Sequence, residues 1–310
     1  MHPPFDFGCH AAYAQDERKF HHLKNHLKPA PFQYHAPRSK ADALHLLASL
    51  DDARVLAGGQ SLMPMLNFRL AAPAHVIDLN RTPGLAGIQV SNSTLTIGAM
   101  TRQCDVLESA LVRQHAPLLT QALAHVGHQQ TRNRGTIGGS LCHLDPSAEM
   151  VTTAMAMDAT LIVESQSGAR RIPIAAWAQG YLTNALDAKE MLVAVELPLW
   201  PANHRQAFVE YARRKGDFAI VGVAVLLEVN AQNLVTRAVV SIGGCAAAPQ
   251  RPQAVEQALR NQPATPEAFK AAAKLANQVE AMSDVHVSAD YRKHLARVLT
   301  ERALLQAMQP

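Results

Sequence analysis

Residues 54–62 read Arg-Val-Leu-Ala-Gly-Gly-Gln-Ser-Leu, and this stretch decides how the N-terminal half of the chain folds. Its first three residues are typical of a short buried strand, and the double glycine leads into a helix with Pro64 in its first turn. A strand, a glycine turn and a helix start can present bare backbone N–H groups to a phosphate, because glycine has no Cβ that would block the ligand. An ordinary tight turn would use the same residue types, so this stretch alone leaves both interpretations open.

A second glycine loop follows further along the chain, where residues 132–140 read Arg-Asn-Arg-Gly-Thr-Ile-Gly-Gly-Ser. Each loop carries a hydroxyl, Ser61 in the first and Thr136 in the second. Two such loops fit one diphosphate that is held from two sides by backbone donors and helix ends. The dinucleotide fingerprint GxGxxG and the P-loop pattern GxxxxGK[ST] are both absent, which disfavours a Rossmann protein and an NTPase.

The order of strands and helices predicts an α+β protein. A strand near residue 33, a helix capped by Ser39, and strands at 54–57 and 75–79 form a compact β-α-β unit. The next expected elements are a hairpin with its turn at Asn92-Ser93, a helix capped by Thr101, a helix from Pro117 to Val126, and strands at 159–164, 170–174 and 190–197. The last hundred residues predict three antiparallel strands at 208–213, 219–229 and 234–242, followed by helices at 252–260, 265–281 and 290–308.

Composition and charge narrow the class of protein. The 310 residues suffice for two or three domains, and the net charge of +4 is spread along the chain, unlike the clustered basic stripe of a nucleic-acid binder. No apolar run reaches the length of a membrane span. Cys9, Cys104, Cys142 and Cys245 are far apart, so neither a disulfide framework nor a zinc or iron–sulfur site on this chain is expected, and the scattered thiols suit a reducing cytoplasm.

Few side chains outside the loops point to nucleophilic or acid–base catalysis. No GxSxG elbow is present. Asp145 and Glu149 lie four residues apart and could share a helix face, where capping or a hydrogen bond to a ligand hydroxyl is favoured over acid–base chemistry. His143 is expected to be structural, and Arg132 and Arg134 either support a phosphate or lie in a solvated loop.

Four motifs in order carry a family resemblance: AGGQSLMPMLNFRL at 57–70, RGTIGGSLCHLDPSAE at 134–149, RRKGDFAIVGVAV at 213–225 and SDVHVSADYRKHLARVL at 283–299. They resemble the FAD-binding medium subunit of molybdenum hydroxylases, the xanthine dehydrogenase and aerobic carbon monoxide dehydrogenase family. The resemblance runs from about Lys28 to the end of the chain.

The resemblance implies an FAD-binding domain of the vanillyl-alcohol-oxidase type, made of two α/β subdomains. An α+β C-terminal domain, with a three-stranded antiparallel sheet plus helices, would follow it. We therefore expect an N-terminal extension at 1–28, an FAD-binding domain at 29–205 with subdomains at about 29–85 and 86–205, and a C-terminal flavoprotein domain at 206–310.

The resemblance also implies which residues bind FAD. The FAD pyrophosphate would lie between the two glycine loops, Gly127 and Leu192 match backbone contacts to the cofactor, and Phe218 matches the residue that covers the flavin ring. Glu149 stands where the family usually has Asp near the ribityl or adenosine hydroxyls. The expected cofactor-binding residues are Leu56, Ala57, Gly58, Gly59, Gln60, Ser61, Leu62, Gly127, Thr136, Ile137, Gly138, Gly139, Ser140, Glu149, Leu192 and Phe218.

Departures from the family pattern affect these assignments. Ser140 stands where Asn or Asp is commoner, and Glu149 is longer than Asp, so both could shift the FAD affinity. No histidine matches the covalent flavin attachment of some relatives of the wider fold, so FAD is expected to be non-covalent. No residue of this chain is expected to act as catalytic acid, base or metal ligand.

The implied function is that of an electron-transfer subunit in the cytoplasm. A small iron–sulfur subunit with [2Fe-2S] clusters would deliver electrons taken from substrate at the molybdenum cofactor of a large subunit, in a dimer of heterotrimers. The flavin would pass them to NAD, a quinone or oxygen. A free-standing flavin-dependent oxidase of the same superfamily and a non-enzymatic nucleotide-binding scaffold are the alternatives.

The N-terminal residues differ from the rest of the chain. They are rich in His and charge, with His21, His22 and His26 close together, so a metal site there is an alternative to a loosely ordered tail. Family members typically begin with Met-Lys-Pro-Ala-Pro-Phe, and Leu27 is followed here by Lys-Pro-Ala-Pro-Phe. We therefore expect Leu27 to be the true start, encoded by an alternative start codon.

Overall fold

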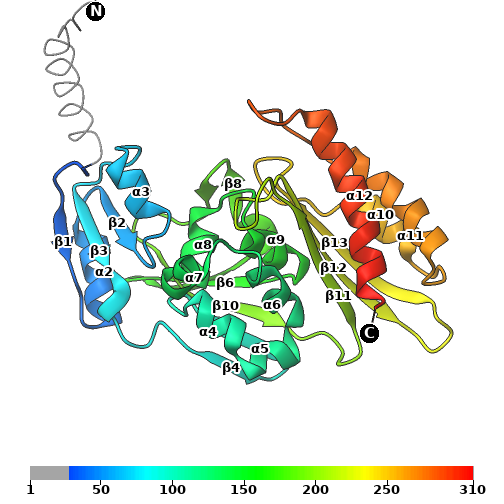
Figure 1. Cartoon of the computed structure of the whole chain (residues 1–310). Helices are drawn as coiled ribbons and strands as arrows, with labels where there is room; N and C mark the ends of the chain where they lie inside the picture. The colour runs from blue at the N-terminus through cyan, green and yellow to red at the C-terminus, as the bar shows by residue number, and fades with distance from the viewer. Residues whose placement is uncertain (1–27, 310) are drawn as a thin grey trace, which may run out of the picture.

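The computed structural model describes residues 28–309, and the expectations on residues 1–26 lie outside them. Its main sheets follow one another along the molecule, from the small N-terminal sheet to the C-terminal sheet with its covering helices (Figure 1). The mixed α/β architecture with a three-stranded antiparallel sheet at its C-terminal end confirms the predicted fold class.

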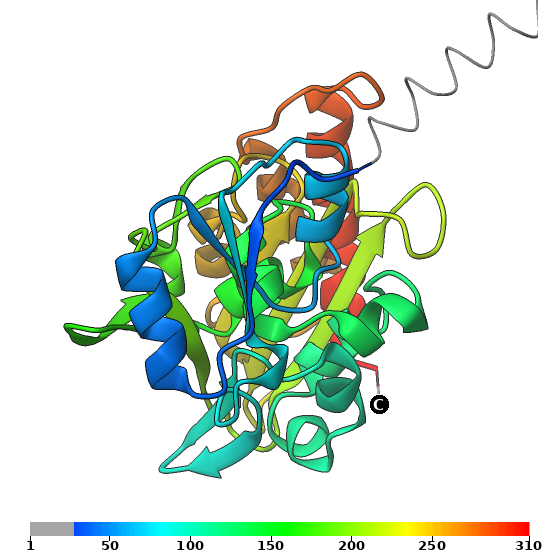
Figure 2. The same ribbon diagram turned by 90° about the vertical axis from the view of Figure 1, so that its left-hand side faces the viewer.

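The small N-terminal sheet has the order β1-β3-β2, with all strands parallel. Its elements are β1 (Gln33–His35), α2 (Lys40–Ser49), β2 (Ala53–Leu56), α3 (Leu62–Asn67), β3 (His75–Asp78) and the 3₁₀ turn η1 (Leu79–Arg81). Ser39 caps α2 as predicted, because its Oγ accepts a hydrogen bond from the Asp42 N–H at 3.0 Å. Figure 2 looks onto this sheet and α2, which lie in front of the central part of the molecule.

The core beneath the small sheet is not made by that sheet alone. Leu44, Leu47 and Ile77 are buried together with Met191 and Val193, which come from a strand of the neighbouring sheet. The small sheet, and with it the loop that follows β2, is therefore packed against the central part of the molecule.

The central sheet is antiparallel and has the order β4-β5-β10-β6-β7. Its strands are β4 (Ile88–Ser91), β5 (Thr94–Gly98), β6 (Thr160–Ser165), β7 (Gly168–Pro173) and β10 (Met191–Pro198). The turn of the predicted hairpin is confirmed, since Asn92 and Ser93 have φ of 48° and 64° and join β4 to β5. A two-stranded ribbon of β8 (Ala178–Gly180) and β9 (Thr183–Asn184), preceded by the 3₁₀ turn η2 (Ile174–Ala176), lies outside this sheet.

Helices pack on the central sheet (Figure 1). They are α4 (Gln103–Glu108), α5 (Ala110–His115), α6 (Pro117–Leu123), α7 (Gln129–Arg134), α8 (Ile137–His143) and α9 (Glu149–Ala156). The expectation that Thr101 caps α4 is wrong: Arg102 holds the cap position, and the Thr101 Oγ1 accepts from the Gly87 N–H at 2.9 Å. Helix α7 ends at Arg134 and α8 begins at Ile137, so only Gly135 and Thr136 of the loop expected at 132–140 lie outside helices.

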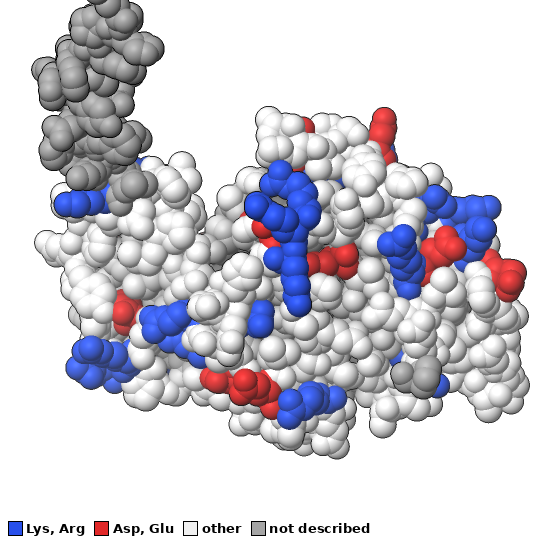
Figure 3. All heavy atoms as spheres, in the orientation of Figure 1, with Lys and Arg blue, Asp and Glu red and all other residues white. Residues whose placement is uncertain are grey.

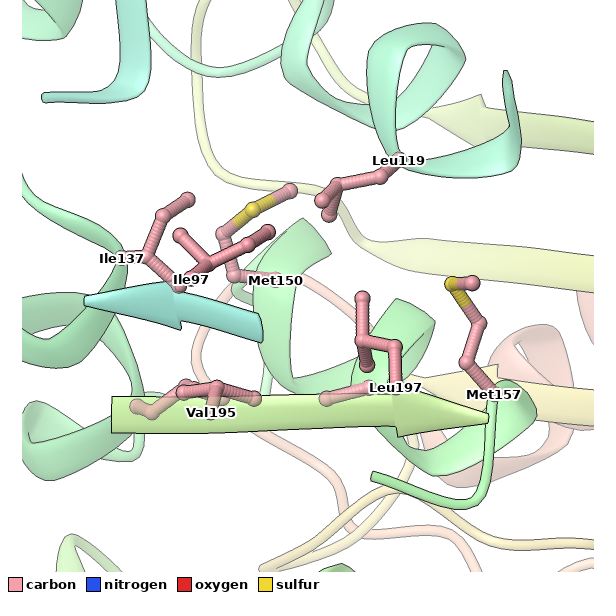
Figure 4. A pocket seen from close by; sticks show the side chains of 9 residues that line it. Ile97, Leu119, Ile137, Met150, Met157, Val195 and Leu197 are labelled. Atoms are coloured by element: carbon pink, nitrogen blue, oxygen red, sulfur yellow. The ribbon is translucent and has the colours of Figure 1, made fainter. Parts of the chain in front are cut away.

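The helical layer and the central sheet are tightly packed. A gap between Ile97, Ile137, Met150 and Leu197 measures about 10 Å³ and has apolar walls (Figure 4). A space of this size holds no more than one water molecule, and its lining offers that water no partner. This gap is therefore a packing defect of the core and not a ligand site.

The C-terminal sheet is antiparallel with the order β11-β12-β13, as predicted. Its strands are β11 (Arg205–Tyr211), β12 (Val221–Val229) and β13 (Val235–Gly243), and the helices that follow are α10 (Gln253–Leu259), α11 (Pro266–Ala273), the 3₁₀ turn η3 (Lys274–Gln278) and α12 (Ala289–Ala307). Alternate residues of β12 enter two different cores: Ala224 and Leu226 pack towards α9, while Val223 and Val225 pack towards α12. Because both faces are covered, β12 has no charged residue from Val221 to Leu227 and is buried over that stretch instead of alternating.

Candidate functional site

The two glycine loops lie in direct contact, although they are far apart in the sequence. Gly58 lies so close to the second loop that a Cβ built on it would be 2.2 Å from the Arg134 carbonyl oxygen and 2.8 Å from the Gly135 Cα. On the other side of the contact, a Cβ on Gly139 would be 3.4 Å from the Cβ of Ala57. The structure thus brings together the two segments that the sequence analysis paired.

The first loop offers a row of free backbone donors. Within the described residues, the N–H groups of 58–62 have no hydrogen-bond acceptor, whereas those of Met63 and Met65 bond to the carbonyls of Gly59 and Ser61 at 3.1 Å. Gly59 has a φ of 75°, which turns successive N–H groups of the loop into a concave arrangement. Several neighbouring donors that find no acceptor among residues 28–309 fit an anionic group such as a diphosphate.

The second loop differs from this picture. The N–H of Ile137 donates to the Thr101 carbonyl at 3.1 Å, that of Gly138 to the Ala99 carbonyl at 2.9 Å, and that of Gly139 to the Thr136 Oγ1 at 3.0 Å. Donors were expected from both loops, but the N–H groups at 137–139 already bond to acceptors within the protein. The second loop therefore acts as the wall against which the first loop is positioned.

The glycines also have a different role from the one expected. A Cβ on Gly138 would lie 2.5 Å from the Cβ of Ala99, just as a Cβ on Gly58 would meet the Arg134 carbonyl. At both positions glycine is required by the close approach of another segment of the chain, whichever ligand binds there. Leu192 lies near this contact: it precedes a bulge in β10 at Val193, whose carbonyl accepts from the Ala99 N–H at 2.9 Å.

Two polar residues that the sequence analysis missed connect the loops. Arg102 donates from Nη2 to the Asn80 Oδ1 at 2.6 Å and from Nη1 to the Arg134 carbonyl. Asn80 in turn donates from Nδ2 to the Ala57 carbonyl at 2.9 Å. A single arginine before a helix and a single asparagine after a strand give no sequence signal, because only the tertiary fold brings them together.

Gly127, Glu149 and Phe218 belong to a second group, at the junction with the C-terminal sheet. Gly127 lies in the turn between α6 and α7, and its carbonyl accepts a hydrogen bond from the Arg132 Nη1 at 3.3 Å. The Arg132 side chain therefore stabilises this turn and does not extend freely into solvent. A Cβ on Gly216 would be 2.9 Å from the His128 Cε1, which places the loop between β11 and β12 against the same turn. That loop carries Phe218, whose side chain is 62% exposed.

Glu149 is a buried carboxyl at the first position of α9. Its residue is only 6% exposed, and burial raises the pKa of the carboxyl to about 8. A helix N-terminus favours the ionised carboxylate by only about 0.3–1 kcal/mol, which is too little to offset the cost of burying the charge. The expectation that Asp145 shares its helix face is wrong, because Asp145 precedes α9 and its Oδ1 accepts from the Ser147 N–H at 2.9 Å.

An ion pair between the two halves of the molecule adjoins Glu149. The His125 Nδ1 lies 3.2 Å from the Glu210 Oε1, and this hydrogen bond raises the pKa of His125. The other oxygen of Glu210 is buried without a hydrogen-bond partner among the described residues. The negative charge of Glu210 further raises the pKa of Glu149, so the three side chains form one electrostatic cluster.

Basic side chains gather near this second group. Arg213, Arg214 and Lys215 are exposed in the loop that also carries Phe218, and Arg214 pairs with Asp217 at 3.3 Å. On the face seen in Figure 3, a column of basic atoms stands between the central helices and the C-terminal sheet. Within residues 28–309, no three His, Cys, Asp or Glu side chains are placed to hold a metal ion.

Comparison with known families assigns both halves of the chain. Residues 30–200 match the family described as the FAD binding domain in molybdopterin dehydrogenase, and residues 206–307 match the CO dehydrogenase flavoprotein C-terminal domain. The chain belongs to the molybdopterin dehydrogenase flavoproteins. The resemblance found in the sequence motifs is confirmed, and so are FAD as the cofactor and the place of the chain among oxidoreductase subunits.

Individual flavoproteins of this family align along nearly their whole length. The chain is 39% identical over 284 residues to the 6-hydroxypseudooxynicotine dehydrogenase complex subunit alpha of Paenarthrobacter nicotinovorans, covering 91% of this chain and 96% of that subunit. It is similar in structure to carbon monoxide dehydrogenase of Hydrogenophaga pseudoflava, with a TM-score of 0.86, 37% identity, and coverage of 90% of this chain and 98% of that one.

A third similar structure is quinoline 2-oxidoreductase of Pseudomonas putida 86, with a TM-score of 0.87, 36% identity, and coverage of 90% of this chain and 98% of that one. These relatives act on chemically different substrates, so the shared flavoprotein fold does not define a substrate. None of the helices in the described part of this chain combines the length and apolar character needed to cross a bilayer.

Proposed function

We propose that this chain is the FAD-carrying electron-transfer subunit of a molybdenum hydroxylase complex, which takes electrons from an iron–sulfur subunit and passes them to an external acceptor. The observation that carries the proposal is the row of free N–H donors at 58–62, held against the second glycine loop at the edge of a closed, apolar core. Such a site suits a diphosphate-bearing cofactor. A free-standing oxidase would instead need a substrate pocket with its own general base over the flavin.

We assign the diphosphate of FAD to the first loop, Leu56–Leu62, with the second loop, Thr136–Ser140, as the opposing wall. The remaining proposed contacts are Gly127, Glu149, Leu192 and Phe218. FAD is bound non-covalently and, when bound, supplies the redox chemistry through its flavin ring. The chain itself contributes binding, orientation and control of access.

Glu149 suits a hydrogen bond to a cofactor hydroxyl. With a pKa of about 8 its carboxyl is largely protonated at neutral pH, so it can both donate and accept a hydrogen bond. Phe218 suits a cover over the flavin, because a large apolar side chain that is 62% exposed has no packing role within the chain itself. The basic loop residues beside it would favour an anionic acceptor or an acidic partner surface.

The domain boundaries at 29–205 and 206–310 follow from the same proposal, with subdomains meeting near residue 85. The partners are a small subunit with [2Fe-2S] clusters and a large subunit with the molybdenum cofactor, arranged as a dimer of heterotrimers in the cytoplasm. Support comes from the relatives, one of which is named as a subunit of a dehydrogenase complex and another as a carbon monoxide dehydrogenase medium chain.

The test is a single-turnover electron transfer experiment. The iron–sulfur subunit of the proposed complex is reduced, freed of excess reductant and mixed with the oxidised flavoprotein. Cluster oxidation and flavin reduction are then followed by absorbance. We expect the two signals to change together and the chain stripped of FAD to leave the clusters reduced. Clusters that stay reduced in the presence of the FAD-loaded chain would contradict the proposal, and so would a chain that oxidises small substrates by itself.

A further inference from the structure

Arg102 and Asn80 form a hydrogen-bonded connection between the two glycine loops. The connection runs from the Ala57 carbonyl to the Asn80 side chain (2.9 Å), from there to the Arg102 guanidinium (2.6 Å), and on to the Arg134 carbonyl. Ala57 opens the first loop, and Arg134 precedes the second. No other charged side chain in the described part of the molecule bonds to both sides of this contact.

The backbone at Arg102 and the backbone at Asn80 are both held in place by hydrogen bonds. The backbone around Arg102 pairs with the second loop, since the Gln103 N–H donates to the Gly135 carbonyl at 2.9 Å and residue 102 bridges to Thr136. Asn80 is fixed at the end of β3, where its N–H donates to the Asp78 Oδ1 at 2.8 Å. The Arg102 and Asn80 side chains, each held by its own backbone contacts, therefore set the distance between the first and the second glycine loop.

The connection ends at the point where the loops touch. The carbonyl oxygen of Arg134 accepts from Arg102, and the same oxygen would be 2.2 Å from a Cβ on Gly58. A small shift of this carbonyl would move the wall that supports the donors at 58–62. Burial and the nearby positive charge of Arg134 lower the pKa of Arg102, so two cationic side chains lie close together at this contact. An anion at the loops would offset this positive charge.

We propose that Arg102, acting through Asn80, is a positioning residue that sets the spacing of the two glycine loops and thereby the affinity for the FAD diphosphate. This inference rests on the placement of the diphosphate at the first loop. It goes beyond that placement, because neither side chain is itself among the assigned cofactor contacts.

The test measures the FAD dissociation constant of the FAD-free chain by titration, for Arg102→Gln, Asn80→Ala and the double variant. Each single variant removes the hydrogen bond between Arg102 and Asn80. The loss of a hydrogen bond to a charged group corresponds to about a 10- to 100-fold change in an equilibrium constant, so we expect each variant to bind FAD about 10- to 100-fold more weakly. Because both residues act through one connection, the double variant should be no weaker than Arg102→Gln alone. Lysine at position 102 keeps the charge without the two-pronged geometry and should restore only part of the affinity.

Arg170→Gln is the matched control. Like Arg102, Arg170 donates from two guanidinium nitrogens, here at 2.6 Å to each carboxylate oxygen of Glu190, but it lies on β7 at an edge of the central sheet. The FAD affinity of the Arg170→Gln variant should stay within about two-fold of that of the parent chain, since an exposed ion pair contributes little to stability. Thermal unfolding of the FAD-free variants separates a loss of affinity from a loss of fold, and Asn80→Ala provides a second, milder variant.

Two outcomes would overturn the inference: FAD affinities of Arg102→Gln and Asn80→Ala equal to that of the parent chain, or fully additive losses in the double variant. A parent chain that does not bind FAD would contradict the proposed function instead. The two failures are therefore distinguishable.

Discussion

Replacing Glu149 by Gln should remove most of the dependence of folding stability on pH in the acid-to-neutral range. The carboxyl has a pKa of about 8 in the folded chain against 4.5 as its ordinary value, because it is buried and faces Glu210. Between these values the folded chain holds a proton that the unfolded chain has lost, so stability falls as pH rises from 4.5 to 8 and is level above that.

The size of the effect follows from the same two values. Each unit of difference corresponds to about 1.4 kcal/mol, and the linkage relation gives a loss of about 2–3 kcal/mol between pH 5 and pH 7. His125, whose pKa is raised by Glu210, contributes a slope of the same sign, because protonated His125 is stabilised only in the folded chain. Asp145 and Lys215 also face this cluster and are unchanged in the variant. The difference between parent and variant therefore isolates Glu149.

The assay is urea unfolding of the FAD-free chain at several pH values from 5 to 8. The parent should lose stability across this range, and Glu149→Gln should show a much flatter profile. Glu164→Gln is the control, since Glu164 pairs at the surface with Lys40 at 2.8 Å and should leave the slope unchanged. Equal slopes for the parent and Glu149→Gln would refute the argument that burial keeps this carboxyl protonated.

Three further substitutions test separate parts of the structure. Gly58→Ala places a Cβ 2.2 Å from the Arg134 carbonyl oxygen and should destabilise the chain by about 1–3 kcal/mol, with loss of bound flavin seen in the absorption spectrum; full flavin occupancy would show that the loops tolerate separation. Phe218→Ala should leave stability within about 0.5 kcal/mol, because the side chain is 62% exposed, but should change the rate of acceptor reduction. Trp177→Phe removes a buried indole N–H bond of 2.8 Å to the Leu141 carbonyl and should cost about 1–3 kcal/mol in thermal unfolding, without changing FAD affinity.

Local signals predicted much of the fold. The Ser39 cap, the Asn92-Ser93 turn and the three C-terminal strands each depend on residues that lie close together in the sequence, and all three are confirmed. Thr101 shows the limit of this reasoning. Its position before a helix suggests a cap, but its hydroxyl is used by Gly87, a partner that only the tertiary fold brings close.

The candidate site was predictable in its segments but not in its contacts. The double glycines identify the two loops, yet the reason for glycine at 58 and 138 is the carbonyl of Arg134 and the Cβ of Ala99. The contact of Gly58 with Arg134 and that of Gly138 with Ala99 cannot be predicted from hydrophobic periodicity, because each joins residues that are far apart in the sequence. Arg102 and Asn80 could not be predicted as site residues for the same reason. Polar residues at the ends of helices and strands are common, and the pairing of these two depends on how the small sheet packs against the central part of the molecule.

The shared core beneath the small sheet bears on how the chain is made by the ribosome. Leu44, Leu47 and Ile77 emerge early in synthesis, whereas their partners Met191 and Val193 arrive only when β10 has been translated. At about 5–20 residues per second, this apolar face stays incomplete for several seconds, long enough to attract chaperones or other nascent chains. A fragment that ends before β10 should therefore aggregate, and the first glycine loop should gain its final shape late in synthesis although it is among the first segments to be translated.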